Sequence, residues 1–168
     1  MPVRRRAYDR PVAARLLLTG FARQEPHLIR MLPVRTLLMP TQDSLPFANL
    51  IGVKVTNVTR EQVEAELFVR EDLCTRPAVL HGGAVMALAD TVGAVATLAN
   101  LPEGTWTTTI ESKTNFFAAI PAGDTARAQC TPLHRGRSTM VWQTRIFRGD
   151  GRLAAVVTQT QLVTSATS

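Results

Sequence analysis

One short segment of the chain combines residue types that could do chemistry on an anion or a carbonyl group. His81 is followed by Gly82 and Gly83, and Asp90 comes eight residues after Gly82 within a long apolar stretch. Two glycines at the start of a helix leave the backbone N–H groups of its first turn unshielded, and these donors together with the helix dipole attract negative charge. The alternative interpretation is that the two glycines only allow a tight turn into the helix and have no functional role.

Asp90 is the only ionisable residue between His81 and Glu103. On a helix that is apolar on nearly every face, a carboxylate needs a partner, a proton or a chemical role, because burying an unpaired charge is strongly unfavourable. An arginine on another element would satisfy this need without any catalysis. A catalytic carboxylate is the alternative interpretation.

The spacing of Gly82 and Asp90 leads to a prediction about assembly. A helix rises about 1.5 Å per residue, so the two positions lie roughly 12 Å apart along it. Catalysis at a carbonyl needs hydrogen-bond donors about 3 Å from the oxygen and a base within reach of the attacking water. Two antiparallel copies of the helix could place each Asp90 beside the other copy's Gly82. If the two residues act together, the protein is at least a dimer with its sites at the interface.

The elements around this segment are expected to form one α+β domain, in which the helix packs on an antiparallel sheet. Residues 82–99 approach membrane-spanning length, but a charge at the middle costs roughly 2.5–3.5 kcal/mol on insertion, so we interpret them as a buried helix of a globular domain. A short helix is expected around residues 47–50, ending at Gly52. Alternating polar and apolar residues predict strands at 63–69, 106–117, 125–133, 138–148 and 153–163.

The 168 residues divide into an N-terminal segment, 1–45, and the predicted domain, 46–168. Residues 7–32 are interpreted as a surface helix and residues 33–46 as a proline-containing linker. Arginines concentrate in the first 35 residues and account for much of the net charge of +6. Such a surplus favours an anionic partner such as nucleic acid. No nucleic-acid-binding module accompanies it, so this interpretation is an alternative that we do not favour.

The location of the protein is expected to be the cytoplasm. The apolar stretch after the first arginines is interrupted by Arg15 and is too short for a secretory signal, while an organelle transit peptide stays an alternative. The two cysteines, Cys74 and Cys130, lack metal-binding spacing and cannot form a disulfide framework. Reduced thiols fit a cytoplasmic protein.

The string His81-Gly82-Gly83 followed by Ala89-Asp90-Thr91 resembles the motif of the hotdog-fold thioesterases, specifically the PaaI-like and 4-hydroxybenzoyl-CoA thioesterase group. The resemblance implies the hotdog fold, in which a long central helix packs on a curved antiparallel sheet. It also implies hydrolysis of an acyl-CoA or aryl-CoA thioester by a homodimer, which could pair into a homotetramer. It runs from about Phe47 to Val163, including Asn115-Phe116-Phe117 ahead of Gly123-Asp124 and the Gly136-Arg137 turn.

The resemblance also implies catalytic roles for individual residues. The backbone N–H of Gly82 would polarise the thioester carbonyl, and His81 would fix that loop and approach the same oxygen. Asp90 of the partner chain would act as general base on water or as nucleophile. Thr109 would hydrogen-bond the attacking water. No metal or organic cofactor is implied, because coenzyme A is part of the substrate.

Substrate binding is expected at a second set of residues, namely Thr75, Gly83, Thr91, Gly136 and Arg137. Gly136 and Arg137 fall where the family commonly meets the nucleotide end of coenzyme A, and an arginine there would suit a phosphate. An arginine that is merely exposed on a hairpin is the alternative.

Two positions depart from the pattern of many relatives, because Thr75 and Ala78 stand where those carry Asn and Gly. A threonine hydroxyl need not reach the point that the asparagine amide reaches. A hotdog protein that binds acyl-CoA without hydrolysing it is therefore an alternative, and a hydratase of the same fold is another. The residues do not identify the acyl group.

Overall fold

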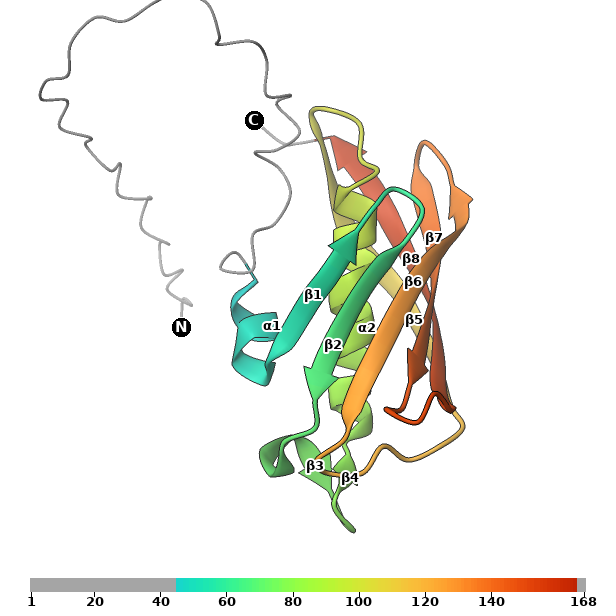
Figure 1. Cartoon of the computed structure of the whole chain (residues 1–168). Coiled ribbons are helices and arrows are strands. Elements are labelled where there is room, and N and C mark those ends of the chain that lie inside the picture. Colours follow the sequence, from blue (N-terminus) through green and yellow to red (C-terminus); the bar gives the residue numbers. More distant parts are fainter. Residues whose placement is uncertain (1–44, 166–168) are drawn as a thin grey trace, which may run out of the picture. The chain divides into compact units, whose positions relative to one another are not determined.

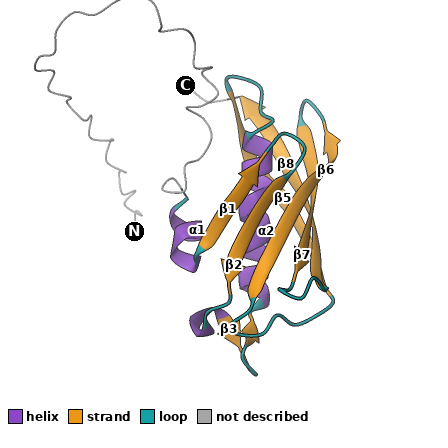
Figure 2. Cartoon of the chain, viewed as in Figure 1, coloured by secondary structure: helices purple, strands orange, loops and turns teal. Residues whose placement is uncertain are grey.

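The computed structural model of the chain describes residues 45–165, which form two layers. A six-stranded antiparallel sheet wraps around one side of a long helix (Figures 1 and 2). The sheet has the order β1-β2-β6-β7-β8-β5. In chain order the elements are α1 (Pro46–Ile51), β1 (Val53–Val58), β2 (Val63–Phe68), the 3-10 turn η3 (Glu71–Leu73), β3 (Cys74–Thr75), β4 (Val79–Leu80), α2 (Gly82–Leu98), β5 (Thr105–Phe116), β6 (Thr125–Arg135), β7 (Thr139–Phe147) and β8 (Leu153–Ser165).

The predicted packing of one long helix on an antiparallel sheet is confirmed. The expected helix at residues 7–32 and nearly all of the expected linker lie outside the described residues. The short helix α1 ends at Gly52, whose φ of 87° is the left-handed conformation that glycine adopts at low cost. Each predicted strand is present, with ends that differ by up to two residues.

The core lies between α2 and the concave face of the sheet. Leu88 and Val92 of α2 are fully buried, as are Trp142 and Ile146 of β7. Burying an apolar side chain of this size contributes roughly 1.5–3 kcal/mol, so the contact of helix and sheet supplies much of the stability. Inward residues recur at every second position of β6 and β7, because successive side chains of a strand point to opposite faces.

Strand β5 lies at one edge of the sheet, where it pairs with β8 alone among the described strands. It is 12 residues long and carries exposed Trp106, Ile110 and Phe116. A long apolar edge of this kind is a template for pairing with another strand. The periodicity of the sequence predicts this strand but not its position at the edge.

The segment between β2 and α2 fixes the start of the long helix. Strands β3 and β4 form a small hairpin, and the backbone of Ala78 within it has a φ of 60°. The N–H of Leu80 donates to the carbonyl oxygen of Ile120 (2.8 Å), and the N–H of His81 donates to that of Leu73 (2.9 Å). These bonds hold the chain on both sides just before α2 begins. Among the helices of residues 45–165, none has the length and apolar character that crossing a membrane would require.

Candidate active site

The first turn of α2 leaves the backbone N–H of Gly82 without a hydrogen-bond partner among the described residues. His81 is the N-cap, and its ring Nδ1 accepts a hydrogen bond from the N–H of Gly83 (2.9 Å). The carbonyl oxygen of His81 accepts from the N–H groups of Ala84 (2.9 Å) and Val85 (3.2 Å). The N–H of Gly82 is therefore the donor of this turn that stays open for an oxyanion or a carbonyl oxygen.

The hydrogen bond at Nδ1 also determines which nitrogen of the neutral His81 ring carries the proton. A ring nitrogen that accepts a hydrogen bond is unprotonated, so in the neutral ring the proton lies on Nε2. His81 is exposed, and none of the residues that the structure describes pairs with its Nε2, so the Nε2–H can donate outward. This arrangement supplies a second donor close to the start of the helix.

An apolar pocket of about 370 Å³ opens beside Gly82. A Cβ atom on Gly82 would lie 3.2 Å from Cζ of Phe116, so the glycine lets this ring close over the start of the helix. A carbonyl with an apolar substituent would find both a hydrogen-bond donor and an apolar surface here. The lining residues are Leu80, Gly82, Val85, Phe116, Phe117, Ala118, Ala119, Ile120, Ala154 and Ala155.

Asp90 lies on the side of α2 that faces the edge strand β5. The hydroxyl of Thr109 on β5 donates to Asp90 Oδ1 (3.1 Å), so the structure brings these two predicted catalytic residues together within one chain. Asp90 is exposed in the single chain. The alternative in which an arginine pairs with Asp90 finds no support in the ion pairs of the described residues.

Two buried glutamines of β8 complete the surroundings of this carboxylate. Gln159 Nε2 donates to Asp90 Oδ1 (2.5 Å) and to Thr109 Oγ1 (3.1 Å). Gln161 Nε2 donates to the same Thr109 oxygen (2.9 Å). Both glutamines are only 1% exposed. A carboxylate, a hydroxyl and two amides thus form one network on the concave face.

Gln159 and Gln161 are absent from the sequence-based set of site residues. Their signal is the alternation of β8, in which Val157, Gln159, Gln161 and Val163 share one face of the strand. Two polar side chains on an otherwise apolar inward face require partners, because buried polar groups are nearly always hydrogen-bonded. The spacing shows that they face inward, but it does not show that Asp90 is their partner.

The two parts of the candidate site lie apart within a single chain. The start of α2 presents Gly82 and His81, while Asp90 lies eight residues further along the same continuous helix, where it contacts Thr109 of β5. This continuity supports the estimate of roughly 12 Å from Gly82 to Asp90 along the helix. A single chain therefore does not bring the open N–H and the carboxylate to one carbonyl group.

The predicted substrate-binding residues have varied surroundings. Thr75 is exposed on the β3–β4 hairpin, where it pairs with Val79. The Thr91 hydroxyl donates to the carbonyl oxygen of Ala87 (2.8 Å), a bond within α2 itself. Gly83 belongs to the helix start described above. The roles of these residues in binding stay predictions.

Gly136 and Arg137 lie in the turn between β6 and β7. Gly136 has no room for a side chain, because a Cβ atom there would lie 2.9 Å from the carbonyl oxygen of Thr139 and closer still to the His134 ring. Arg137 is exposed. An exposed arginine fits a phosphate contact and also fits the alternative of a solvated hairpin residue.

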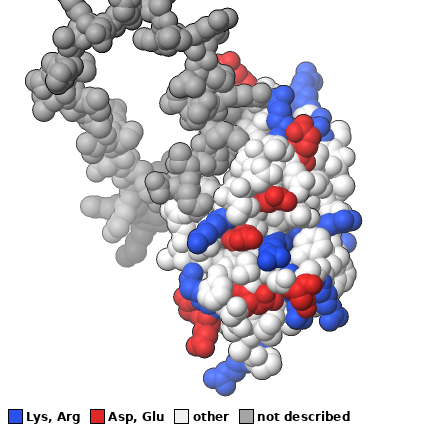
Figure 3. All heavy atoms as spheres, in the orientation of Figure 1, with Lys and Arg blue, Asp and Glu red and all other residues white. Residues whose placement is uncertain are grey.

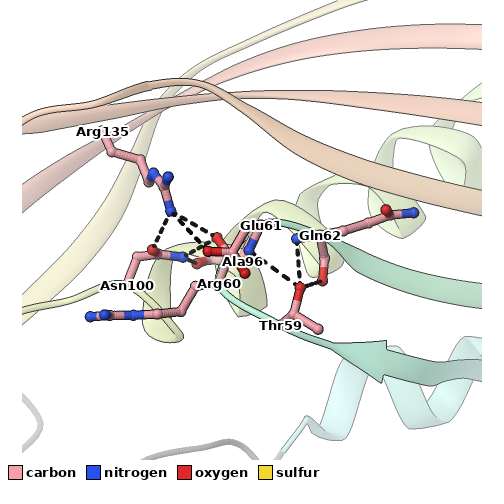
Figure 4. Close-up of polar contacts among 7 residues, drawn as sticks. All are labelled: Thr59, Arg60, Glu61, Gln62, Ala96, Asn100 and Arg135. Atoms are coloured by element: carbon pink, nitrogen blue, oxygen red, sulfur yellow. Dashed lines mark hydrogen bonds and ion pairs between the residues drawn. The ribbon is translucent and has the colours of Figure 1, made fainter.

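A polar network anchors this hairpin at the C-terminal end of α2 (Figure 4). Arg135 Nη1 donates to Asn100 Oδ1 (3.2 Å) and to the carbonyl oxygen of Arg60 (3.1 Å). Asn100 Nδ2 donates to the carbonyl oxygens of Arg60 (3.0 Å) and Ala96 (2.9 Å). The β6–β7 turn therefore lies at the opposite end of the helix from Gly82.

Three aromatic residues of the domain have different surroundings. Trp142 is fully buried in the core, Phe117 is exposed and lines the pocket beside Gly82, and Trp106 is exposed on the edge strand. Glu111 is also exposed and accepts a hydrogen bond from the Thr160 hydroxyl (3.0 Å).

On the face of the molecule seen in Figure 3, basic and acidic side chains are interspersed. In the part of the chain that the structure describes, no group of three or more His, Cys, Asp or Glu side chains could hold a metal ion.

Comparisons with known proteins relate this geometry to an enzyme family. Residues 78–155 match the sequence profile of the thioesterase superfamily. The chain is 30% identical over 102 residues to the proofreading thioesterase EntH of Cronobacter turicensis, which covers 61% of this chain and 74% of that protein. A thioesterase structure from Haemophilus influenzae superposes with a TM-score of 0.67 at 28% identity, covering 73% of this chain and 85% of that one. The E. coli PaaI protein from the phenylacetic acid degradation operon has the same fold, with a TM-score of 0.67 at 21% identity over 73% of this chain and 86% of that one.

Proposed function

Because this chain belongs to the thioesterase superfamily and has its hotdog fold, we propose that it hydrolyses an acyl-CoA or aryl-CoA thioester to the free acid and coenzyme A. The observation that carries the proposal is the open N–H of Gly82 at the start of α2, beside an apolar pocket that Gly82 itself lines. In a thioester substrate the carbonyl oxygen accepts a hydrogen bond and the acyl group packs in apolar surroundings, so both would find their counterparts here. If that oxygen binds the N–H of Gly82, the roles of the other site residues can be assigned from their positions around it.

The start of α2 would stabilise charge on the carbonyl oxygen. Attack on the carbonyl carbon converts this oxygen into an oxyanion, and a fixed N–H at a helix N-terminus stabilises developing negative charge without reorganisation. The Nε2–H of His81 would be a second donor to the same oxygen. His81 also holds the turn in shape through its bond to Gly83.

Asp90 would drive the attack from the facing chain of a homodimer. As general base it takes a proton from water while the water oxygen bonds to the carbonyl carbon, the C–S bond then breaks, and the thiolate of coenzyme A recovers the proton. As nucleophile it bonds to the carbonyl carbon, the C–S bond breaks and releases the thiolate of coenzyme A, and water then hydrolyses the resulting anhydride to the free acid, freeing Asp90 and a proton for the thiolate. Both routes need Asp90 within reach of a carbonyl that is held by Gly82, and its own Gly82 is roughly 12 Å away.

The exposed edge strand β5 supports the proposed homodimer. Its unpaired side would align with the same strand of a second copy, and a two-fold axis would set the two α2 helices antiparallel. Two such dimers could pair further into a tetramer. Each active site would then combine the helix start of one copy with Asp90 and Thr109 of the other.

The β6–β7 turn would contact the nucleotide part of coenzyme A. Arg137 is exposed there and would pair with a phosphate, and Gly136 would let the backbone approach it. Thr75, Gly83 and Thr91 would complete the contacts to the substrate. No metal or organic cofactor takes part in the proposed reaction. Two free thiols, Cys74 and Cys130, are consistent with the proposed cytoplasmic location.

The test is release of free thiol from a panel of short, long and aromatic acyl-CoAs by the wild type and by Asp90→Asn. We expect hydrolysis by the wild type and a loss on the order of 10²–10⁴-fold in Asp90→Asn, because the amide can neither accept the proton nor attack. Binding of acyl-CoA without thiol release would instead identify the non-hydrolysing protein. Consumption of an enoyl-CoA without thiol release would identify a hydratase.

A further inference from the structure

The hydrogen bonds of Thr109 leave its hydroxyl with no free capacity. A hydroxyl has one hydrogen to donate and two lone pairs that accept. Both lone pairs are taken, one by Nε2 of Gln159 (3.1 Å) and one by Nε2 of Gln161 (2.9 Å). Its single hydrogen is then directed to Asp90 Oδ1, 3.1 Å away. In this arrangement Thr109 fixes the carboxylate and has nothing left with which to hold water.

Gln159 acts on the same carboxylate oxygen directly. Its two amide hydrogens go to Asp90 Oδ1 and to Thr109 Oγ1, both of which are acceptors. The opposite orientation of the amide would set its oxygen against the carboxylate, so the network itself determines which atom faces Asp90. Gln161 is oriented in turn by the Thr107 hydroxyl, which donates to its Oε1 (3.0 Å) and shares that hydrogen with the Leu162 carbonyl oxygen (3.1 Å).

The position of Gln159 in this network lowers the stability of the folded chain. The Oε1 atom of Gln159 is buried and has no hydrogen-bond partner within residues 45–165. A buried acceptor without a partner destabilises the folded chain, and an apolar residue of similar size would avoid this. Gly93 of α2 makes room for the amide, since a Cβ atom there would overlap that oxygen. A residue that stabilises the fold poorly and contacts Asp90 closely is suited to a role in the reaction.

We propose that Gln159 is a positioning residue for the thioesterase reaction, which holds Oδ1 of Asp90 together with Thr109 so that Oδ2 faces the substrate. The proposal rests on the proposed function. Among the described residues, Oδ1 accepts both hydrogen bonds to this carboxylate, and Oδ2 has no partner. Gln161 supports Gln159 indirectly, because it fills the second lone pair of Thr109 and thereby directs the Thr109 hydrogen to Asp90.

The experiment compares kcat, KM and the thermal midpoint of Gln159→Leu with the wild type, on a thioester that the wild type cleaves. Leucine fills most of the same space and removes the unpartnered oxygen, so we expect a thermal midpoint that is unchanged or higher. We expect kcat to fall by about 10²-fold, because a misplaced catalytic group loses about that much, while KM stays within about twofold. The matched control is Gln143→Leu on the outer face of β7, which should leave kcat unchanged.

A double-variant cycle tests whether Gln159 acts together with Thr109. If both hold the same oxygen of Asp90, Gln159→Leu should reduce kcat far less in a Thr109→Val background than in the wild type. Equal fold-losses in both backgrounds, or a kcat of Gln159→Leu within about threefold of the wild type, would overturn the positioning role while leaving the proposed function intact. A wild type that releases no thiol from any thioester would overturn the proposed function, and this inference with it.

Discussion

The backbone N–H of Gly82 can be deleted by a substitution without breaking α2, because Gly82 is the first residue of that helix. Proline is well tolerated at this position, and the preceding His81 (φ −63°, ψ 139°) already has the extended backbone that a residue before proline prefers. Gly82→Pro therefore deletes the donor, whereas Gly82→Ala keeps it. Both variants add a Cβ atom 3.2 Å from the Phe116 ring.

We expect Gly82→Pro to lose on the order of 10²–10³-fold in kcat relative to Gly82→Ala, as loss of one oxyanion donor does. Steady-state kinetics on the same thioester measure the difference, and the shared Cβ atom cancels any effect of displacing Phe116. Equal kcat values for the two variants would exclude the Gly82 N–H from the reaction. Circular dichroism and thermal midpoints would check that both variants fold.

The thiol of Cys130 is expected to make stability depend on pH in the alkaline range. Burial on the inner face of β6 raises the pKa of Cys130 to about 11, and a hydrogen bond with Thr144 offsets part of the shift. The unfolded chain, with a cysteine pKa near 9.0, releases this proton first. The contribution to the free energy of unfolding is therefore complete below about pH 9 and is lost as the pH rises towards 11, by at most about 3 kcal/mol.

Denaturant titrations at several pH values between 8 and 11 would measure this loss. The free energy of unfolding of Cys130→Ala should decrease less with rising pH than that of the wild type. Cys74→Ala, which removes the half-buried thiol, is the control and should give the same curve as the wild type. Parallel curves for the wild type and Cys130→Ala would show that the thiol has no such role.

At the scale of elements, α2 and β8 fit together through one glycine. Gly93 has no side chain, and the Gln159 amide occupies the space that a Cβ atom would need. We expect Gly93→Ala to lower the free energy of unfolding by roughly 1–3 kcal/mol, because overpacking outweighs the better helix propensity of alanine. It should also reduce kcat, since the amide is pushed away from Asp90.

A compensating change separates the two effects of Gly93→Ala. Adding Gln159→Val returns the space that the new methyl group needs, so stability should recover, but kcat should not, because valine cannot donate a hydrogen bond. Thermal melts and kinetics on the single and double variants measure both quantities. Recovery of kcat in the double variant would mean that packing at Gly93, and not the amide, controls activity.

The elements differ in how far sequence could predict them. The α2 helix follows from the length of its apolar stretch, and strands β5 to β8 follow from the alternation of apolar residues, because burial on one face of a strand imposes that period. The order of strands does not, since the pairing of β5 with β8 depends on contacts between residues far apart in the chain. The same limit applies to the site. The spacing of Gly82 and Asp90 is local and visible, whereas the bond of Gln159 to Asp90 joins positions 69 residues apart.

At the scale of the whole molecule, the open edge of the sheet at β5 is expected to determine the oligomeric state. An edge strand of 12 residues on which Trp106, Ile110 and Phe116 are exposed in the single chain is poorly suited to a monomer. We expect light scattering coupled to size exclusion to find a dimer or a tetramer. Ile110→Lys should weaken the association, because charges at an edge oppose strand pairing. A monomeric wild type with full activity would contradict the shared site.

Sites shared between two chains give a specific result when different variants are combined. In a heterodimer of Asp90→Asn and Gly82→Pro chains, one site combines the intact Gly82 of the first chain with the intact Asp90 of the second, and the other site lacks both. Purified through two different affinity tags, this heterodimer should have about half of the wild-type activity, although each parent is nearly inactive.

The reciprocal heterodimer distinguishes this arrangement from a site within one chain. It pairs a wild-type chain with a chain that carries both Asp90→Asn and Gly82→Pro. With shared sites each of its two sites contains one defective residue, so it should be nearly inactive, whereas a site contained within one chain would leave half of the activity. The two heterodimers contain the same substitutions and differ only in how these are distributed between the chains. The ratio of their activities therefore measures directly whether Asp90 acts on its own chain's Gly82 or on that of its partner.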